Sequence, residues 1–176
     1  MIRPIALGLT LLSLAFGSVQ PARADGDEAF FQSVFGRWTG PGEIVAGKYK
    51  GTKFVCDLAG IQPDKAVGMS LDGSCRVGMF SQPMTATFTR GGASYKGSFL
   101  DGSKGKGLDI VSGDVTGNRV VVGLDRKQLK GAMVARLEEQ DKLKITISVQ
   151  VANELVPVIG MTLKRDESVK RASLEK

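Results

Sequence analysis

The chain lacks histidine altogether and has two cysteines and one tryptophan among its 176 residues. Without histidine it has no Ser-His or Cys-His nucleophile pair, and two thiols alone do not complete a zinc site. Its carboxylates fall mostly at expected turns and strand ends, and no two of them stand out as a general acid and base. We therefore expect a protein that is not an enzyme and needs no metal or cofactor.

The sequence also lacks an apolar run long enough to span a bilayer, which takes roughly 20 residues. Its most apolar stretch is Ile5–Phe16, preceded by Arg3 and followed by the small-x-small pattern Ala22-Arg23-Ala24. This arrangement is typical of a secretory signal peptide. We predict a signal peptide over Met1–Ala24, a periplasmic or secreted protein and no transmembrane anchor after cleavage. An uncleaved anchor is the alternative.

Charge of one sign does not dominate the chain, which has 24 Lys and Arg against 18 Asp and Glu. Loss of Arg3 and Arg23 with the signal peptide would lower the formal net charge from +6 to +4. The lysines are spread out and not clustered with aromatic residues, so no nucleic-acid partner is expected. The length predicts a single domain over residues 25–165, followed by a charged tail over 166–176.

A period of two in the apolar residues dominates the chain from Arg37 onward, and it is clearest in Lys142–Val151. This period is typical of half-buried strands. After the strand that starts near Arg37, we expect strands at Thr52–Leu58, Val67–Val77, Met84–Thr89, Ser94–Leu100, Leu108–Val115, Arg119–Leu124, Gly131–Glu138, Lys142–Val151 and Val156–Arg165. Such spacing predicts an all-β fold, an antiparallel up-and-down barrel of about 8–10 strands, because closure removes exposed edges.

The stretch before and within the first strand contains the only tryptophan, Trp38. A short helical turn over Glu28–Phe35 would bring Phe30, Phe31, Val34 and Phe35 close to one face. In the strand itself, Gly40 and Gly42 share the phase of Trp38. We interpret Trp38 as a ring that closes one end of the barrel, where a neighbouring backbone passes close to the glycines. The alternative is an ordinary core tryptophan followed by turn glycines.

The two cysteines are Cys56 and Cys75. In an exported chain such a pair predicts one disulfide, with two free thiols as the alternative. Closing a loop of this size stabilises the folded state by about 3 kcal/mol in the chain-entropy model.

A glycine- and lysine-rich stretch, residues 102–107, is the one candidate for an anion site. Lys104, Gly105 and Lys106 could form a backbone nest for a phosphate or another anion. The stretch does not match a P-loop, and no helix pattern follows it. A mobile hairpin loop is the alternative.

Gly36-x-Trp38 at the start of the first strand, after a helical turn, resembles the lipocalins and the wider calycin group. In that family the tryptophan closes the barrel floor, and a basic side chain from the last strand crosses it. The resemblance implies that Arg165 plays this part here. It also implies that the barrel binds a small apolar ligand in its interior.

A second resemblance is to bacterial periplasmic inhibitors of serralysin-type metalloproteases. It is carried by Gly36-x-Trp38, Cys56-Asp57-Leu58 and Cys75 in that order. Those inhibitors insert an N-terminal arm into the protease, and the corresponding segment here is Asp25–Gln32.

The function expected from the sequence is that of an exported, non-enzymatic β-barrel that binds a small, partly apolar ligand. Many inward-facing positions are Gly, Ala or Met, which predicts an interior cavity on the order of a few hundred Å³. The alternative is a protein-interaction or protease-inhibitor barrel that acts through its N-terminal arm or its loops.

Overall fold

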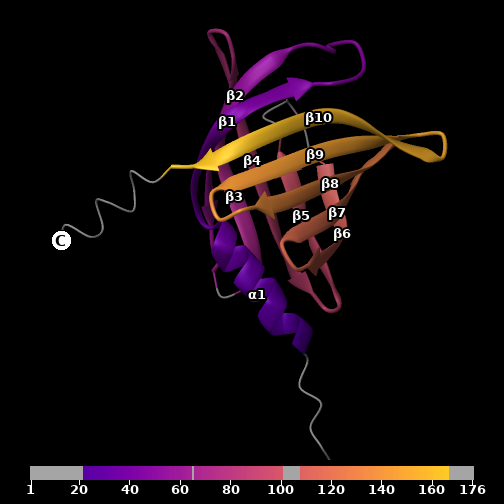
Figure 1. Ribbon diagram of the computed structural model, residues 1–176. Coiled ribbons are helices and arrows are strands. Elements are labelled where there is room, and N and C mark those ends of the chain that lie inside the picture. Colours follow the sequence, from indigo (N-terminus) through magenta and orange to yellow (C-terminus); the bar gives the residue numbers. More distant parts are fainter. Residues whose placement is uncertain (1–21, 65, 101–107, 167–176) are drawn as a thin grey trace, which may run out of the picture.

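A computed structural model describes residues 22–64, 66–100 and 108–166. One helix leads into ten antiparallel strands, and each strand pairs with the next along the chain (Figure 1). The last strand pairs with the first and closes the barrel, so the predicted up-and-down β-barrel is confirmed. The elements are α1 Ala22–Val34, β1 Gly36–Ile44, β2 Lys53–Ile61, β3 Gly68–Val77, β4 Phe80–Gly91, β5 Ser94–Leu100, β6 Leu108–Thr116, β7 Arg119–Arg126, β8 Leu129–Glu138, β9 Lys142–Val151 and β10 Glu154–Arg165.

Alternation of apolar and polar residues places one face of each strand in the core. In β9, Leu143, Ile145 and Ile147 are buried, whereas Lys144 is exposed. This matches the period of two in the sequence, since successive side chains of a strand point to opposite faces.

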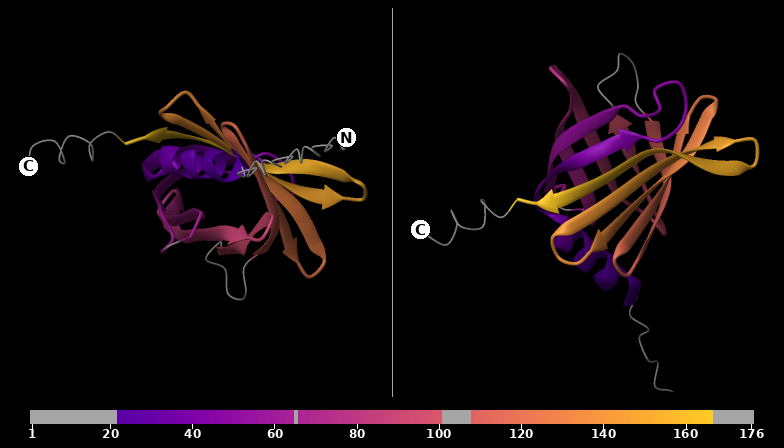
Figure 2. Two further views of the ribbon diagram at one scale, coloured as in Figure 1. Left: turned by 90° about the horizontal axis from the view of Figure 1, so that it is seen from below. Right: turned by 45° about the horizontal axis from the view of Figure 1, so that its top comes forward.

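The barrel has two different ends. Neighbouring strands run in opposite directions, so the hairpins β1–β2, β3–β4, β7–β8 and β9–β10 all lie at one end, which we call the open end. The helix α1 lies at the other, the closed end (Figure 1). Seen from below, α1 runs across that opening, and it contacts both β3 and β6 (Figure 2).

The helix is longer than the predicted turn over Glu28–Phe35. It begins at Ala22 and ends at Val34, so the prediction was wrong at the start by six residues and at the end by one. Alanine and arginine at positions 22–24 are good helix formers, although sequence reasoning assigned them to a cleavage pattern. The helix therefore begins inside the segment predicted as the signal peptide.

Some predictions fall on parts of the chain that the structure leaves out. Residues 1–21 and 167–176 lie outside the described residues, so the signal peptide over 1–24 and the charged tail over 166–176 stay predictions. Within the described ranges, no helix has the length and apolar character needed to cross a bilayer.

Candidate functional site

The floor of the barrel is formed by Trp38, whose side chain is fully buried at 0% exposure. Its indole nitrogen donates a hydrogen bond to the carbonyl oxygen of Val34 at 2.9 Å, which ties the ring to the end of α1. Trp38 and Arg165 are register partners on β1 and β10, and the Arg165 guanidinium carbon lies 4.2 Å from the centre of the indole ring. The structure thus brings the two residues of the expected barrel closure together.

Arg165 has a second role that sequence reasoning missed. Its guanidinium donates to the carbonyl oxygens of Phe35 at 2.6 Å and Ser33 at 2.5 Å, and to that of Gln140 at 3.1 Å. The last carbonyls of a helix have no partner within the helix and carry partial negative charge. Arg165 therefore joins the end of α1, the β8–β9 turn and the Trp38 ring.

A buried polar cluster holds the first half of α1 against the barrel. Asp27 is only 8% exposed, and it accepts a hydrogen bond from the Tyr95 hydroxyl at 2.7 Å. Its carboxylate also forms an ion pair with Arg90, whose Nε lies 3.4 Å from the Tyr95 oxygen. Burial, together with the hydrogen bond to Asp27, raises the pKa of Tyr95 to about 12. The phenol is therefore neutral at ordinary pH, which suits a structural contact.

This cluster was not found from the sequence, because Asp27 lies 63 residues from Arg90 and 68 from Tyr95. One signal was available. Asp27 precedes Phe30, Phe31 and Val34 by three, four and seven residues, which places a carboxylate on the apolar face of the helix. A carboxylate on such a face predicts a buried partner of opposite charge.

Aromatic rings complete the closed end. Phe31 of α1 contacts Phe88 and Tyr95 edge-to-face, with ring centres 5.7 and 5.4 Å apart. Edge-to-face packing has a preferred geometry and adds to the burial of apolar area. The helix is thus held in one position by directional contacts.

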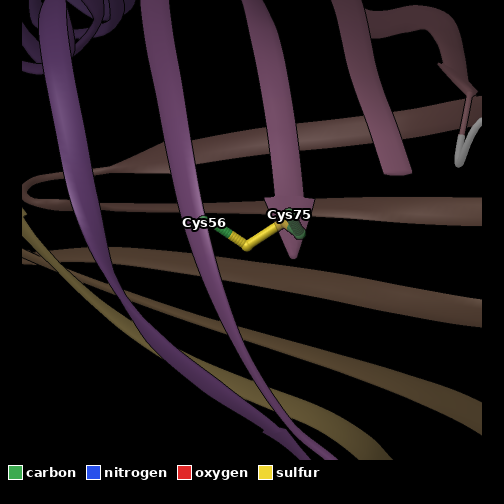
Figure 3. Close-up of a disulfide and its surroundings, with 2 residues drawn as sticks. All are labelled: Cys56 and Cys75. Atoms are coloured by element: carbon green, nitrogen blue, oxygen red, sulfur yellow. A yellow bond between two sulfur atoms is a disulfide. The ribbon is translucent and has the colours of Figure 1, made fainter. Parts of the chain in front are cut away.

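The disulfide predicted between Cys56 and Cys75 is confirmed. The two residues are direct partners on β2 and β3, with Cα atoms 4.0 Å apart, and Figure 3 shows the sulfur bridge crossing between the strands. Both residues are buried inside the barrel. The bond therefore links two neighbouring strands from within.

An apolar cavity lies inside the barrel beside this disulfide. Its volume is about 30 Å³, enough for one or two water-sized groups. Apart from Thr85, apolar residues and Cys75 line it: Leu58, Leu71, Met84, Ala86, Phe99, Met133, Ile145, Ile147 and Met161. Among the described residues, this cavity is far smaller than the few hundred Å³ that the sequence suggested.

The cavity is small because neighbouring groups occupy the space beside the glycines of β1. A Cβ atom at Gly42 would overlap the Phe54 ring, and one at Gly40 would overlap the Thr162 carbonyl of β10. The glycines of β1 therefore allow close approach of neighbours and do not leave voids. Protein interiors pack to the density of organic crystals, so neighbouring groups fill the space that a missing side chain would leave.

Larger hollows lie on the outside of the barrel. One, of about 440 Å³, lies over β1, β2, β9 and β10 beside Lys53 and Lys144. Another, of about 470 Å³, lies beside Lys130, Gln150 and Leu155. Both are open to solvent, so the interior cavity is the better candidate for enclosing an apolar ligand.

The remaining candidate, the anion nest at Lys104, Gly105 and Lys106, lies outside the described residues and stays a prediction. In the residues that the structure does describe, no three His, Cys, Asp or Glu side chains come close enough together to hold a metal ion.

Comparison with known proteins supports the fold. No protein-family model matches the chain, and no curated protein sequence matches it. A protein with unknown function of the DUF3598 family from Nostoc punctiforme PCC 73102 is similar in structure, with a TM-score of 0.50 and 17% identity. The match covers 77% of this chain and 49% of that one, so the chain spans about half the length of that relative.

Rv2717c from M. tuberculosis is also similar in structure, with a TM-score of 0.58 and 14% identity. This match covers 80% of this chain and 97% of that one. At such identities the likeness concerns the fold alone. The chain is thus a ten-stranded β-barrel with solved structural neighbours, and its resemblance to lipocalins stays a prediction.

Proposed function

We propose that this protein is an exported, non-enzymatic binding protein that takes up a small, largely apolar ligand through the open end of its barrel. Export rests on the signal-peptide pattern of residues 1–24. The observation that carries the binding function is the apolar interior cavity beside the Cys56–Cys75 disulfide.

The cavity is small without a ligand, but flexible side chains line it and could make room for one. Three of its side chains are methionines, Met84, Met133 and Met161, which come from three different strands. Methionine is unbranched and adapts its shape to fill irregular space. A ligand would displace these side chains, whereas the disulfide would keep β2 and β3 in place.

The same lining supports a role without catalysis. None of the described residues around the cavity is a carboxylate, an amine or a free thiol, since Cys75 is in the disulfide. Asp27, Arg90 and Tyr95 pair with one another at the closed end. A ligand in this cavity would contact no acid or base that could transfer a proton.

An inhibitor that acts through a free N-terminal arm has less support. The segment Asp25–Gln32 belongs to α1, and its residues Asp27, Phe30 and Phe31 are buried against the barrel. Deleting the segment would remove core residues and not only a binding arm.

The test is native mass spectrometry of the mature protein purified from its own compartment, combined with titration of the apolar dye anilinonaphthalene sulfonate. Ala86→Val narrows the cavity from one wall. Ala59→Val adds the same atoms to the same fold, but on the outer face of β2, beside Asp57 and Asp72. Thermal unfolding of both variants confirms that they fold.

We expect a bound small molecule or dye uptake in the wild type and in Ala59→Val, and a loss of about tenfold or more in affinity in Ala86→Val. Equal binding by both variants would place the ligand elsewhere. A wild-type protein that holds no small molecule and takes up no dye would contradict the proposal.

A further inference from the structure

Exposed apolar side chains gather at the open end. At the tip of the β3–β4 hairpin, Met79 in the turn is 94% exposed and Phe80, the first residue of β4, is 80% exposed. Tyr49, Leu129 and Leu155 are exposed on three further hairpins of that end that the structure describes. We call the tips of these four hairpins, residues 45–53, 76–81, 125–130 and 150–155, the rim.

The described part of the closed end exposes few large apolar side chains. Among the described residues, the large apolar side chains that are exposed lie in the rim or in the open-end half of a strand, with Ile61 as the exception. Exposed apolar residues scattered singly need no explanation, but their concentration at one end of the molecule does.

The rim is also basic. Its exposed cations are Lys48, Lys50, Lys53, Arg76, Lys127 and Lys130. Arg126 adds a half-buried cation, whereas the acidic residues of the rim are Asp125 and Glu154. The ion pairs found in the described ranges lie toward the closed end, namely Arg37–Asp57, Arg90–Asp27 and Glu138 with Lys142 and Lys144. The rim cations are thus available to an external anion.

We infer that the rim docks onto the surface of an anionic lipid bilayer. The apolar side chains stand on the tips of separate hairpins, with lysines beside them, and Tyr49 has an apolar body with a polar end. Apolar groups at the headgroup boundary together with cations near anionic lipid are the two contributions that hold proteins at such a surface. The charge of the rim complements anionic lipid and does not complement a neutral bilayer.

This docking does not depend on the proposed ligand, although it would place the mouth of the barrel against the bilayer. A protein partner or a second copy of the chain is the competing occupant. Those would need one contiguous, shape-complementary patch, whereas the rim is divided among four hairpins.

The experiment is co-sedimentation of the mature protein with vesicles. One set contains phosphatidylcholine and phosphatidylglycerol, the other phosphatidylcholine alone, at low and at high salt. The variant that tests the apolar contribution, called the apolar variant, replaces two exposed side chains of the rim, Met79→Ser with Phe80→Ser. Its control is Ile61→Ser at the closed end. The charge variant is Lys127→Gln with Lys130→Gln, and its control is Lys96→Gln, an exposed lysine near the closed end.

Binding is expected for the anionic vesicles and should weaken with salt, because screening shortens the reach of surface charge. The apolar variant should lower the partition coefficient about tenfold or more. Each lysine removed from the rim should lower it about fivefold. The two control variants and the cavity variant Ala86→Val should bind as the wild type does.

Equal binding to neutral and anionic vesicles, no binding to either, or equal losses in the rim variants and their controls would overturn the inference. So would a dimer, seen by analytical ultracentrifugation, that Met79→Ser with Phe80→Ser dissociates. Vesicle binding that persists in Ala86→Val while dye uptake is lost separates this inference from the proposed function.

Discussion

The two ends of the barrel are built from different kinds of contact. At the closed end, aromatic rings pack edge-to-face, Arg165 covers Trp38 and caps α1, and Asp27 is paired with Arg90 and Tyr95. Methionines line a small cavity in the middle of the barrel, and a disulfide joins β2 and β3 beside it. At the open end, the hairpin tips expose apolar side chains.

The closed end fixes the structure, whereas the rest of the interior can change its arrangement. Directional contacts hold the closed end in one arrangement, because moving any partner breaks several bonds at once. Flexible thioethers tolerate other arrangements around the cavity, and the disulfide holds β2 and β3 together beside it. The stability that comes from packing should therefore depend mainly on the closed end, and binding on the cavity and the open end, with the disulfide as the covalent contribution outside the closed end.

Removing the ring of Trp38 should have the largest effect. Trp38→Ala deletes a fully buried side chain and should lower the free energy of unfolding by about 3–5 kcal/mol. Urea unfolding followed by circular dichroism measures this without a tryptophan signal. The matched change at the open end, Phe80→Ala, should stay within about 0.5 kcal/mol of the wild type. Similar losses in the two variants would erase the distinction between the ends.

Breaking the disulfide should have the next largest effect. Cys56 and Cys75 are 19 residues apart, and losing their bond should lower stability by about 3 kcal/mol. Unfolding with and without reductant measures the loss. The near-ultraviolet circular dichroism of the closed-end rings should persist in the reduced, folded protein. Two alkylated thiols under denaturing, non-reducing conditions would disprove the bond itself.

Removing the carboxylate of Asp27 should weaken the seating of α1. Asp27→Ala leaves the Tyr95 hydroxyl and the Arg90 guanidinium without their buried partner, and should reduce stability by about 1–3 kcal/mol. Glu28→Ala, an exposed neighbour on the same helix, is the control. If the two variants unfold at the same denaturant concentration, the cluster does not hold the helix.

The contact between Arg165 and Trp38 should appear as coupling in a double-mutant cycle. A cation over an indole ring stabilises by about 0.5–2 kcal/mol, and the effects of Trp38→Ala and Arg165→Ala should be non-additive by that amount. Arg165→Ala alone should cost more than the coupling, because three backbone carbonyls also lose their donor. A coupling near zero would mean that the ring and the guanidinium act independently.

Alkaline pH should weaken the closed end through Tyr95. Its pKa is about 12 in the folded protein, above the ordinary value of 10.0, so the unfolded chain releases this proton first. The stabilisation that follows from this raised pKa is complete below pH 10 and is lost as pH rises toward 12. Tyr95→Phe should lower the free energy of unfolding by about 0.5–1.5 kcal/mol at neutral pH. In this variant the free energy of unfolding should also fall less steeply with pH in the alkaline range. An unchanged slope would show that Tyr95 is not the group responsible.

The strands and the ring closure could be predicted from the sequence because both leave local signals. A period of two in apolar residues is visible in any strand with one buried face, as in β9. A lone tryptophan followed by glycines indicates a strand that neighbouring groups approach closely. The disulfide was accessible because the chain has only Cys56 and Cys75 to pair.

The rest depended on packing between distant segments. The partners of Asp27 lie on β4 and β5, and only the folded barrel brings them to α1. The size of the cavity could not be predicted from residue types either. Phe54 fills the space over Gly42, so a small side chain in the sequence did not become a void in the structure.

Hydrogen exchange measured residue by residue tests the distinction between the two ends most directly. Met133 and Ile147 line the cavity, whereas Phe88 and Leu163 lie toward the closed end, and all four are buried within paired strands. We predict that the amides of the first two exchange at least about tenfold faster, through local opening of the strands around the cavity. Equal protection of all four amides would contradict the account, because the barrel would then open as one unit.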